Sequence, residues 1–241
     1  MTRPDRLILI DLARTLALAG MVVFHFVFDL EIFGWVPQDT AITGWFWWHA
    51  RIVAGSFLFL AGLGLWLSHG AGIRWPGFWR RQAKIGAAAA LVTVATYFAL
   101  PGLTIFYGIL HSIFVASLLG LLFLRLPAAA VLAVAAFVFW LPWVWSDPAF
   151  DGWLIWTGLS GRIPATADFE PLFPWFAPFL AGLATGKIFS HFGLWPRLAV
   201  TETPFLRRLS WPGRHSLAVY LIHQPVLIAL VFAATWIYWR I

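Results

Sequence analysis

Residues 7–30 read LILIDLARTLALAGMVVFHFVFDL, a nearly continuous apolar run. About 20 such residues are enough to cross the hydrocarbon core of a bilayer as a helix. The run lacks the period-two alternation of membrane β-barrel strands, and a helix satisfies its backbone hydrogen bonds internally, as lipid requires. This stretch therefore predicts a transmembrane helix, and it decides the fold class.

The rest of the chain repeats this pattern. Its 241 residues are 61% hydrophobic and 11% charged, whereas soluble domains hold roughly 45–50% apolar and about 25% charged residues. A soluble globular domain is thereby excluded, and we expect an all-α, polytopic membrane helical bundle forming one transmembrane domain over residues 1–241. The expected spans, about seven in number, are 7–30, 45–68, 84–100, 107–125, 128–146, 172–190 and 214–238.

Composition excludes several kinds of site. The absence of cysteine rules out a disulfide framework, cysteine-ligated zinc, iron–sulfur clusters and thiol catalysis. The net charge of +6 at pH 7 could indicate a nucleic-acid partner. The basic residues mostly separate the apolar runs, however, so we interpret them as topology signals and expect no nucleic acid.

The charges between the spans predict an orientation, because short loops rich in Lys and Arg stay in the cytoplasm. One set of loops holds most of the cations, and the other set has only Arg162 and Arg240 as cations. The acidic residues of that second set are Glu31, Asp39, Asp147, Asp151, Asp168 and Glu170. The predicted cytoplasmic cations are Arg3, Arg6, Arg74, Arg80, Arg81, Lys84, Arg125, Lys187, Arg197, Arg207, Arg208 and Arg214. We expect a cytoplasmic N-terminus, a C-terminus outside, and a first span that is retained, since it lacks a small-residue cleavage site.

Four ionisable residues of the first span share one face. At 100° per residue, Asp29 lies almost directly above Asp11, and Arg14 and His25 lie within about 60° of that line. Ionisable groups in membrane helices normally face the bundle interior or a cavity. Asp11 and Arg14 could instead form only a local ion pair. His25 and Asp29, spaced i to i+4, indicate either a carboxylate that orients an imidazole or a structural hydrogen bond between helices.

Further polar residues fall in the other spans. In the predicted topology His49, Arg51 and His111 lie in the outer leaflet, at the same depth as His25 and Asp29 of the first span. His223 and Gln224 in the last span are as compatible with a structural role as with a functional one. Gly62 in the second span predicts close helix packing.

The longest outer loop covers residues 147–171. Its Gly, Pro, Trp and acid content is compatible with a lid and equally with a plain connector.

Three motifs in order carry a resemblance to a known family. They are RLILIDLARTLALAGMVVFHFVFDLEIFG at 6–34, IFYGILHSIFVASLLGLLFL at 105–124 and GRHSLAVYLIHQPVLI at 213–228. Together they resemble the bacterial relatives of heparan-α-glucosaminide N-acetyltransferase, a family of polytopic transmembrane acyltransferases, over about residues 3–235.

The resemblance implies transfer of an acyl group, typically acetyl from cytosolic acetyl-CoA, to an acceptor across the membrane. It also implies a catalytic membrane histidine, which is His111 in the Gly-Ile-Leu-His stretch or His25 in the Phe-His-Phe stretch. The sequence leaves open which of the two is the acting base. The expected acceptor is a glycan or another small extracytoplasmic molecule with an amine or hydroxyl. The expected location is the bacterial inner (plasma) membrane, and a homodimer is possible.

We expect an imidazole to take the acceptor's proton as the acceptor attacks the thioester, which is worth about 10²–10⁴-fold in rate. Asp29 would orient His25, and Arg51 or Tyr107 would stabilise the oxyanion; an acyl-imidazole intermediate is equally compatible. The residues expected at the acyl-CoA site are Asp11, Arg14, Arg80, Arg81, Lys84, Arg207 and Arg208, and those expected at the acceptor are His49, Arg162 and His223.

Two rival functions fit some of the same residues. Buried Asp, His and Arg also mark proton relays, so the alternative is a proton-coupled small-molecule exporter or channel. The chain shows no internal repeat of the kind common in transporters. Histidines in several spans also suggest b-type haem, but we expect neither haem nor a metal ion.

Overall fold

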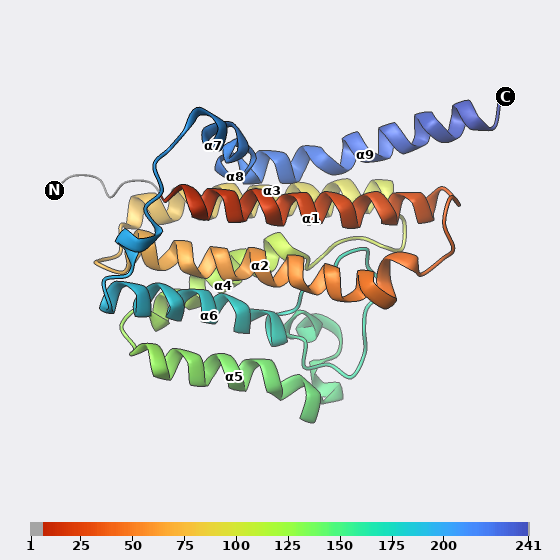
Figure 1. Ribbon diagram of the computed structural model, residues 1–241. Helices are drawn as coiled ribbons and strands as arrows, with labels where there is room; N and C mark the ends of the chain where they lie inside the picture. Colours follow the sequence, from red (N-terminus) through yellow and green to blue (C-terminus); the bar gives the residue numbers. More distant parts are fainter. Residues whose placement is uncertain (1–6, 241) are drawn as a thin grey trace. The chain divides into compact units, whose positions relative to one another are not determined.

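The computed structural model describes residues 7–240, and the regular elements among them are helices (Figure 1). Five helices are long and apolar enough to cross a membrane: α1 (Ile8–Ile32), α2 (Gly44–His69), α3 (Trp75–Ala99), α6 (Leu172–His191) and α9 (Ser216–Tyr238). Two apolar helices are shorter, α4 (Ile109–Gly120) and α5 (Ala128–Val144). The expectation of an all-helical membrane protein is confirmed in this coarse form. The count of seven spans and the orientation of the termini stay predictions, and Arg3 and Arg6 lie outside the described residues.

Short helices fill the connections. These are η1 (Thr40–Ile42), η2 (Leu121–Phe123), η3 (Pro148–Phe150), η4 (Gly152–Thr157), η5 (Trp195–Leu198), α7 (Pro204–Leu209) and α8 (Trp211–Arg214).

One expected boundary was wrong. The third span was expected to begin at 84, but α3 begins at Trp75 with Pro76 in its first turn, a position that suits the fixed φ of proline. Arg80, Arg81 and Lys84 therefore lie inside a helix. The fourth span was expected at 107–125, and α4 with the following η2 covers Ile109–Phe123, within two residues at both ends.

The chain divides into two compact units: unit 1 takes in residues up to Ala54 and again from Pro196, and unit 2 is Gly55–Trp195. In unit 1, α1 packs against α8 and α9. The contact with α8 is close, because a Cβ on Gly213 would lie 1.9 Å from the carbonyl oxygen of Asp11. The Thr15 hydroxyl donates to that same carbonyl and accepts from the N–H of Gly213 (3.0 Å), which fixes the register of α8 on α1.

In unit 2, α6 packs against α5 and α4, and it lies against the part of α2 that follows Ala54. Glycines make the last contact possible, because a Cβ on Gly62 would lie 1.9 Å from the carbonyl oxygen of Phe179. A Cβ on Gly182 would meet the carbonyl of Phe59 at the same distance. The close packing expected at Gly62 is confirmed, as small residues allow between membrane helices.

Candidate active site

A cluster of polar side chains joins α1 to α9 in unit 1. We call His25, Asp29, His223 and Gln224 the α1–α9 cluster. The imidazole rings of His25 and His223 have their centroids 4.9 Å apart. Asp29 is fully buried, and its Oδ1 accepts a 2.7 Å hydrogen bond from Nε2 of Gln224. Two successive residues of α9 therefore meet two residues of α1 that lie one turn apart.

Each member of this cluster keeps one buried polar atom without a hydrogen-bond partner in the described part of the chain. These atoms are His25 Nδ1, Asp29 Oδ2, His223 Nε2 and Gln224 Oε1. A buried polar group without a partner costs about 1–3 kcal/mol. Native proteins keep few such groups, so four in one cluster make this part of unit 1 the candidate site.

The hydrogen bonding of His223 assigns its tautomer. Its Nδ1 lies against the carbonyl oxygen of Tyr220, so Nδ1–H is the donor there. In the neutral ring, Nε2 then carries the lone pair, and it is the buried atom left without a partner. This ring is arranged to accept a proton.

The structure places Asp29 differently from expectation. No hydrogen bond joins Asp29 to His25 in the described residues, and the carboxylate bonds to Gln224 on the other helix instead. The expected orienting of His25 by Asp29 is therefore not formed. Side chains at i and i+4 share a helix face, but the hydrogen bond that Asp29 accepts here, at Oδ1, comes from the neighbouring helix.

At the other end of α1, Asp11 holds two arginines. Its Oδ1 lies 3.1 Å from Arg14 Nη1, and its Oδ2 lies 3.6 Å from Arg214 Nε. Arg214 also bonds to Glu202, which in turn bonds to Arg207. Hydrogen bonds from these two arginines lower the pKa of Glu202. Arg14 is thus engaged with Asp11, and Arg207 with Glu202.

His49 and Arg51, near the start of α2, make local contacts within unit 1. Nε2 of His49 lies 2.8 Å from the carbonyl oxygen of Gly20 on α1, so its N–H donates there and ties the two helices. The exposed Arg51 lies over the ring of Trp47, 3.4 Å from its centroid, and donates to the Trp47 carbonyl. This geometry gives Arg51 a cation–π contact within its own helix.

Unit 2 holds a second group, built around His111 at the start of α4. Its Nδ1 accepts from the N–H of Gly108 (3.3 Å), so Nε2 carries the proton and donates to Thr93 Oγ1 (3.1 Å). The Thr93 hydroxyl in turn donates a hydrogen bond to the carbonyl oxygen of Ile105. Both nitrogens of His111 are therefore engaged. The ring also stacks with that of Tyr107, whose buried hydroxyl has no hydrogen-bond partner within residues 7–240.

The end of the long loop folds back onto this group. The carboxylate of Asp168 accepts from the N–H of Ile109 at 3.0 Å and so caps α4, while the N–H of Glu170 donates to the Tyr107 carbonyl. A Cβ on Gly108 would lie 2.1 Å from Asp168 Oδ2, so glycine is needed there. Burial raises the pKa of Asp168 to about 6, against the hydrogen bond from Ile109.

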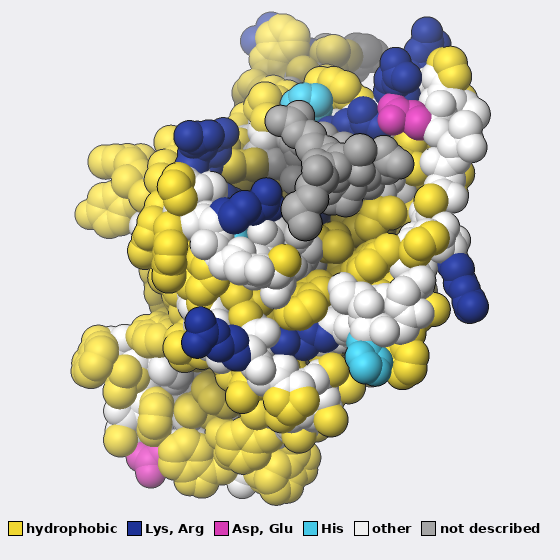
Figure 2. Space-filling view, turned by 90° about the vertical axis from the view of Figure 1, so that its left-hand side faces the viewer, with side chains coloured by type: hydrophobic (Ala, Val, Ile, Leu, Met, Phe, Trp, Pro, Cys, Tyr) yellow, Lys and Arg dark blue, Asp and Glu magenta, His cyan; other side chains and the backbone are white. Residues whose placement is uncertain are grey.

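The remaining expected residues lie at or near the surface. Figure 2 shows Lys and Arg side chains in dark blue among hydrophobic ones on one face of the molecule. Arg80, Lys84 and Arg208 are exposed, while Arg81 is half-buried and donates to Ser117. The exposed Arg162 forms an ion pair with Asp151 at 3.2 Å.

Sequence reasoning missed two contributors. Gln224 was considered together with His223, but its hydrogen bond to Asp29 was not foreseen. Asp168 was considered only as a loop charge, and Thr93 not at all. In the described part of the chain, no three His, Asp or Glu side chains are grouped to hold a metal ion.

Comparison with known proteins decides the family. The model of the heparan-alpha-glucosaminide N-acetyltransferase catalytic domain matches residues 6–225. The chain belongs to this family. Membership in the N-acetyltransferase family indicates a transmembrane acetyltransferase, and the match takes in every residue of the α1–α9 cluster and of the His111 group. No curated protein and no solved structure matches significantly.

Proposed function

We propose that the protein transfers an acetyl or longer acyl group from cytosolic acyl-CoA to an amine or hydroxyl of an extracytoplasmic acceptor, and that the α1–α9 cluster is its catalytic centre. The observation that carries this proposal is the set of four buried, unpartnered polar atoms on His25, Asp29, His223 and Gln224. Two of the four are imidazole nitrogens, which are the commonest general bases. The family match supports the reaction class.

In the proposed reaction, Nε2 of His223 takes the proton of the acceptor as the acceptor's nitrogen or oxygen attacks the thioester carbon. A bond forms between that atom and the acyl carbon, the carbon–sulfur bond breaks, and CoA leaves as a thiolate. The imidazolium then returns its proton to the thiolate, so the products are the acylated acceptor and free CoA. The neighbouring ring of His25, 4.9 Å away between centroids, completes the pair.

Asp29 and Gln224 position this pair. Their 2.7 Å hydrogen bond fixes one helix against the other, and it leaves Asp29 Oδ2 and Gln224 Oε1 to accept hydrogen bonds from an acceptor's N–H or O–H groups. Two oxygens that accept hydrogen bonds suit a substrate with O–H or N–H groups, such as a sugar or an amine. A glycan-like acceptor therefore remains our proposal.

His111 and Tyr107 form a second proposed group. His111 must exchange its bond with Gly108 or with Thr93 before it can accept a proton. Within this second group of unit 2, the buried hydroxyl of Tyr107 is a proposed donor to an oxyanion that forms beside His111. In unit 1, which holds the α1–α9 cluster, the exposed Arg208 is a proposed contact for a CoA phosphate.

The test is single-turnover acyl transfer by the purified protein, with acetyl-CoA and a panel of amines and amino sugars, following release of the CoA thiol. His25→Asn and His223→Asn should each slow transfer by about 10²-fold or more. The matched control is His215→Asn, an exposed histidine at the start of α9. Full rates in both cluster variants would overturn the proposed centre. Proton flux without any transfer would favour an exporter.

A further inference from the structure

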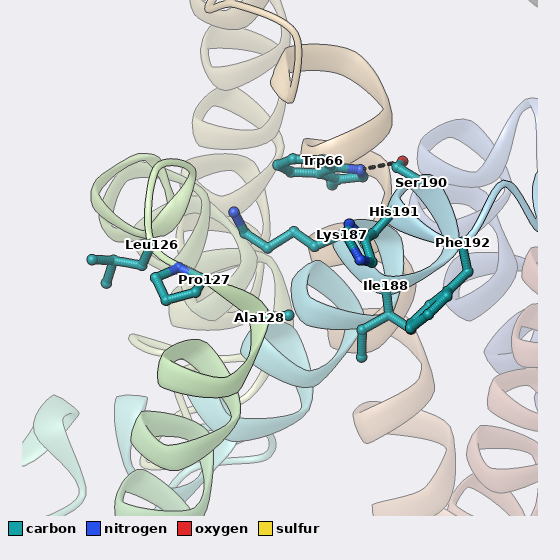
Figure 3. A pocket seen from close by; sticks show the side chains of 9 residues that line it. All are labelled: Trp66, Leu126, Pro127, Ala128, Lys187, Ile188, Ser190, His191 and Phe192. Carbon is teal, nitrogen blue, oxygen red and sulfur yellow. Dashed lines mark hydrogen bonds between the residues drawn. The ribbon is translucent and has the colours of Figure 1, made fainter.

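A pocket of about 600 Å³ opens in unit 2 where α2 and α6 end and α5 begins (Figure 3). Its lining includes Trp66, Leu126, Ala128, Lys187 and Phe192. Pockets of roughly 300–1,000 Å³ bind molecules of drug or cofactor size. None of these residues belongs to the α1–α9 cluster or to the His111 group.

Lys187 supplies a buried positive charge to this pocket. Its side chain is only 8% exposed, its Nζ donates to the carbonyl of Leu124 at 2.7 Å, and it lies 4.3 Å from the ring centroid of Trp66. That indole is held by a 2.8 Å hydrogen bond from Nε1 to Ser190 (dashed in Figure 3). Within residues 7–240, no carboxylate forms an ion pair with Lys187. A buried cation without a counter-charge is costly, and an anion relieves that cost.

The start of α5 adds to the positive potential. Helix α5 begins at Ala128 after Pro127, and no side chain caps its first N–H groups. Ala128 lines the pocket, so this uncapped end lies at its wall. Free N–H groups at a helix start attract anions, and here they act together with the lysine ammonium.

Charge and polarity of the walls select the kind of anion. The lining holds one ammonium, that of Lys187, beside the imidazole of His191, and so small a cationic set suits the single negative charge of a phosphate diester better than the several charges of CoA. The other walls are mostly apolar, and the rim residues Phe192 and Leu126 are 67% and 40% exposed, as expected for side chains that contact acyl chains. Lys187 lies one turn before the end of α6, a candidate membrane span, and lysines near the ends of spanning helices extend toward the lipid head groups.

We propose that this pocket binds the phosphate head group of an anionic phospholipid, with Lys187 as its charged contact and the apolar rim against the acyl chains. The site is independent of the proposed acyl transfer. It gives the protein a lipid-dependent stability at the end of α6.

The experiment uses the purified full-length protein in zwitterionic detergent, titrated with phosphatidylglycerol or with phosphatidylcholine of the same acyl chains. Thermal unfolding and native mass spectrometry report binding. Phosphatidylglycerol should raise Tm saturably and remain bound, and phosphatidylcholine should not. Lys187→Met should weaken the apparent affinity about tenfold or more, since a charge-assisted hydrogen bond is lost. Lys187→Arg should retain binding.

The chain offers a matched control. Its other lysine is the exposed Lys84, and Lys84→Met removes the same charge while leaving the lipid effect intact. Ala128→Phe fills the pocket without touching the lysine and should also abolish the effect, which keeps the test decisive if Lys187→Met folds poorly. Equal stabilisation by both lipids, or an unchanged effect in Lys187→Met and Ala128→Phe, would overturn the proposal. Stabilisation through Lys187 by CoA but not by phosphatidylglycerol would also overturn it.

Discussion

Asp29 on α1 accepts a 2.7 Å hydrogen bond from the side-chain amide of Gln224 on α9, and the carboxylate is fully buried. This bond fixes the rotation of α9 about its axis. Because His223 directly precedes Gln224, the same rotation brings its ring to His25. The pair therefore links the packing of two helices to the geometry of the proposed catalytic centre.

Gln224→Leu tests this link. Removal of the amide leaves the Asp29 carboxylate buried without its donor, so we expect a loss of about 1–3 kcal/mol in the free energy of unfolding, together with slower acyl transfer. Thermal unfolding in detergent and the transfer assay measure the two effects. Gln38→Leu is the control, since Gln38 is exposed in a loop. Wild-type stability in Gln224→Leu would show that the bond does not hold α9 on α1.

Asp11→Ala tests the charged contact at the other end of α1. The change removes the carboxylate shared by Arg14 and Arg214, both of which are more than half-buried. Losing one member of a buried ion pair costs about 3–5 kcal/mol, and the partial exposure of both arginines places the expected loss at about 3 kcal/mol or below. Thermal unfolding measures it. Asp11→Ala together with Arg214→Met should recover part of the loss, and no recovery in the double variant would contradict a coupled network.

Tyr107→Phe separates catalysis from stability. The Tyr107 hydroxyl is buried without a partner in the described residues, so its removal should leave Tm unchanged or slightly higher. If the hydroxyl stabilises the oxyanion, transfer should slow by about 10²-fold with the donor KM unchanged. Tyr97→Phe, an exposed tyrosine of α3, serves as the control. A variant with full activity would remove Tyr107 from the mechanism.

The fold followed from sequence where apolar runs are long and nearly continuous. The limits of α1, α2, α6 and α9 lie within two residues of expectation. The start of α3 was missed because Arg80, Arg81 and Lys84 were interpreted as loop charges, although a helix end accommodates them. The residues just before α4 form hydrogen bonds with the distant segment around Asp168, and no local sequence pattern predicts this pairing.

The candidate site was predicted in part, because ionisable side chains inside apolar runs stand out. His25, Asp29 and His223 were found in this way, and the structure brings them together. The partner of Asp29 was not predicted. Spacing along one helix pointed to His25, whereas the bond crosses to Gln224, and contacts between helices depend on a rotation that periodicity alone does not set.

The pKa of Asp168 predicts a pH dependence of stability. Burial raises this pKa to about 6 in the folded protein, above its ordinary value of 3.8. The folded state therefore binds the proton more tightly than the unfolded state. Stability from this group is fully present below about pH 4 and is lost as the pH rises through about 6.

Asp168→Asn should remove this part of the pH dependence. The amide oxygen can still accept from the N–H of Ile109, so α4 keeps its cap, and Tm near pH 7 should rise relative to wild type. Thermal unfolding in detergent from pH 4 to pH 8 measures both effects. Asp39→Asn is the control, because Asp39 is exposed and its positive φ suits asparagine. A Tm profile in Asp168→Asn that falls between pH 4 and 6 as steeply as in wild type would assign the titration to another group.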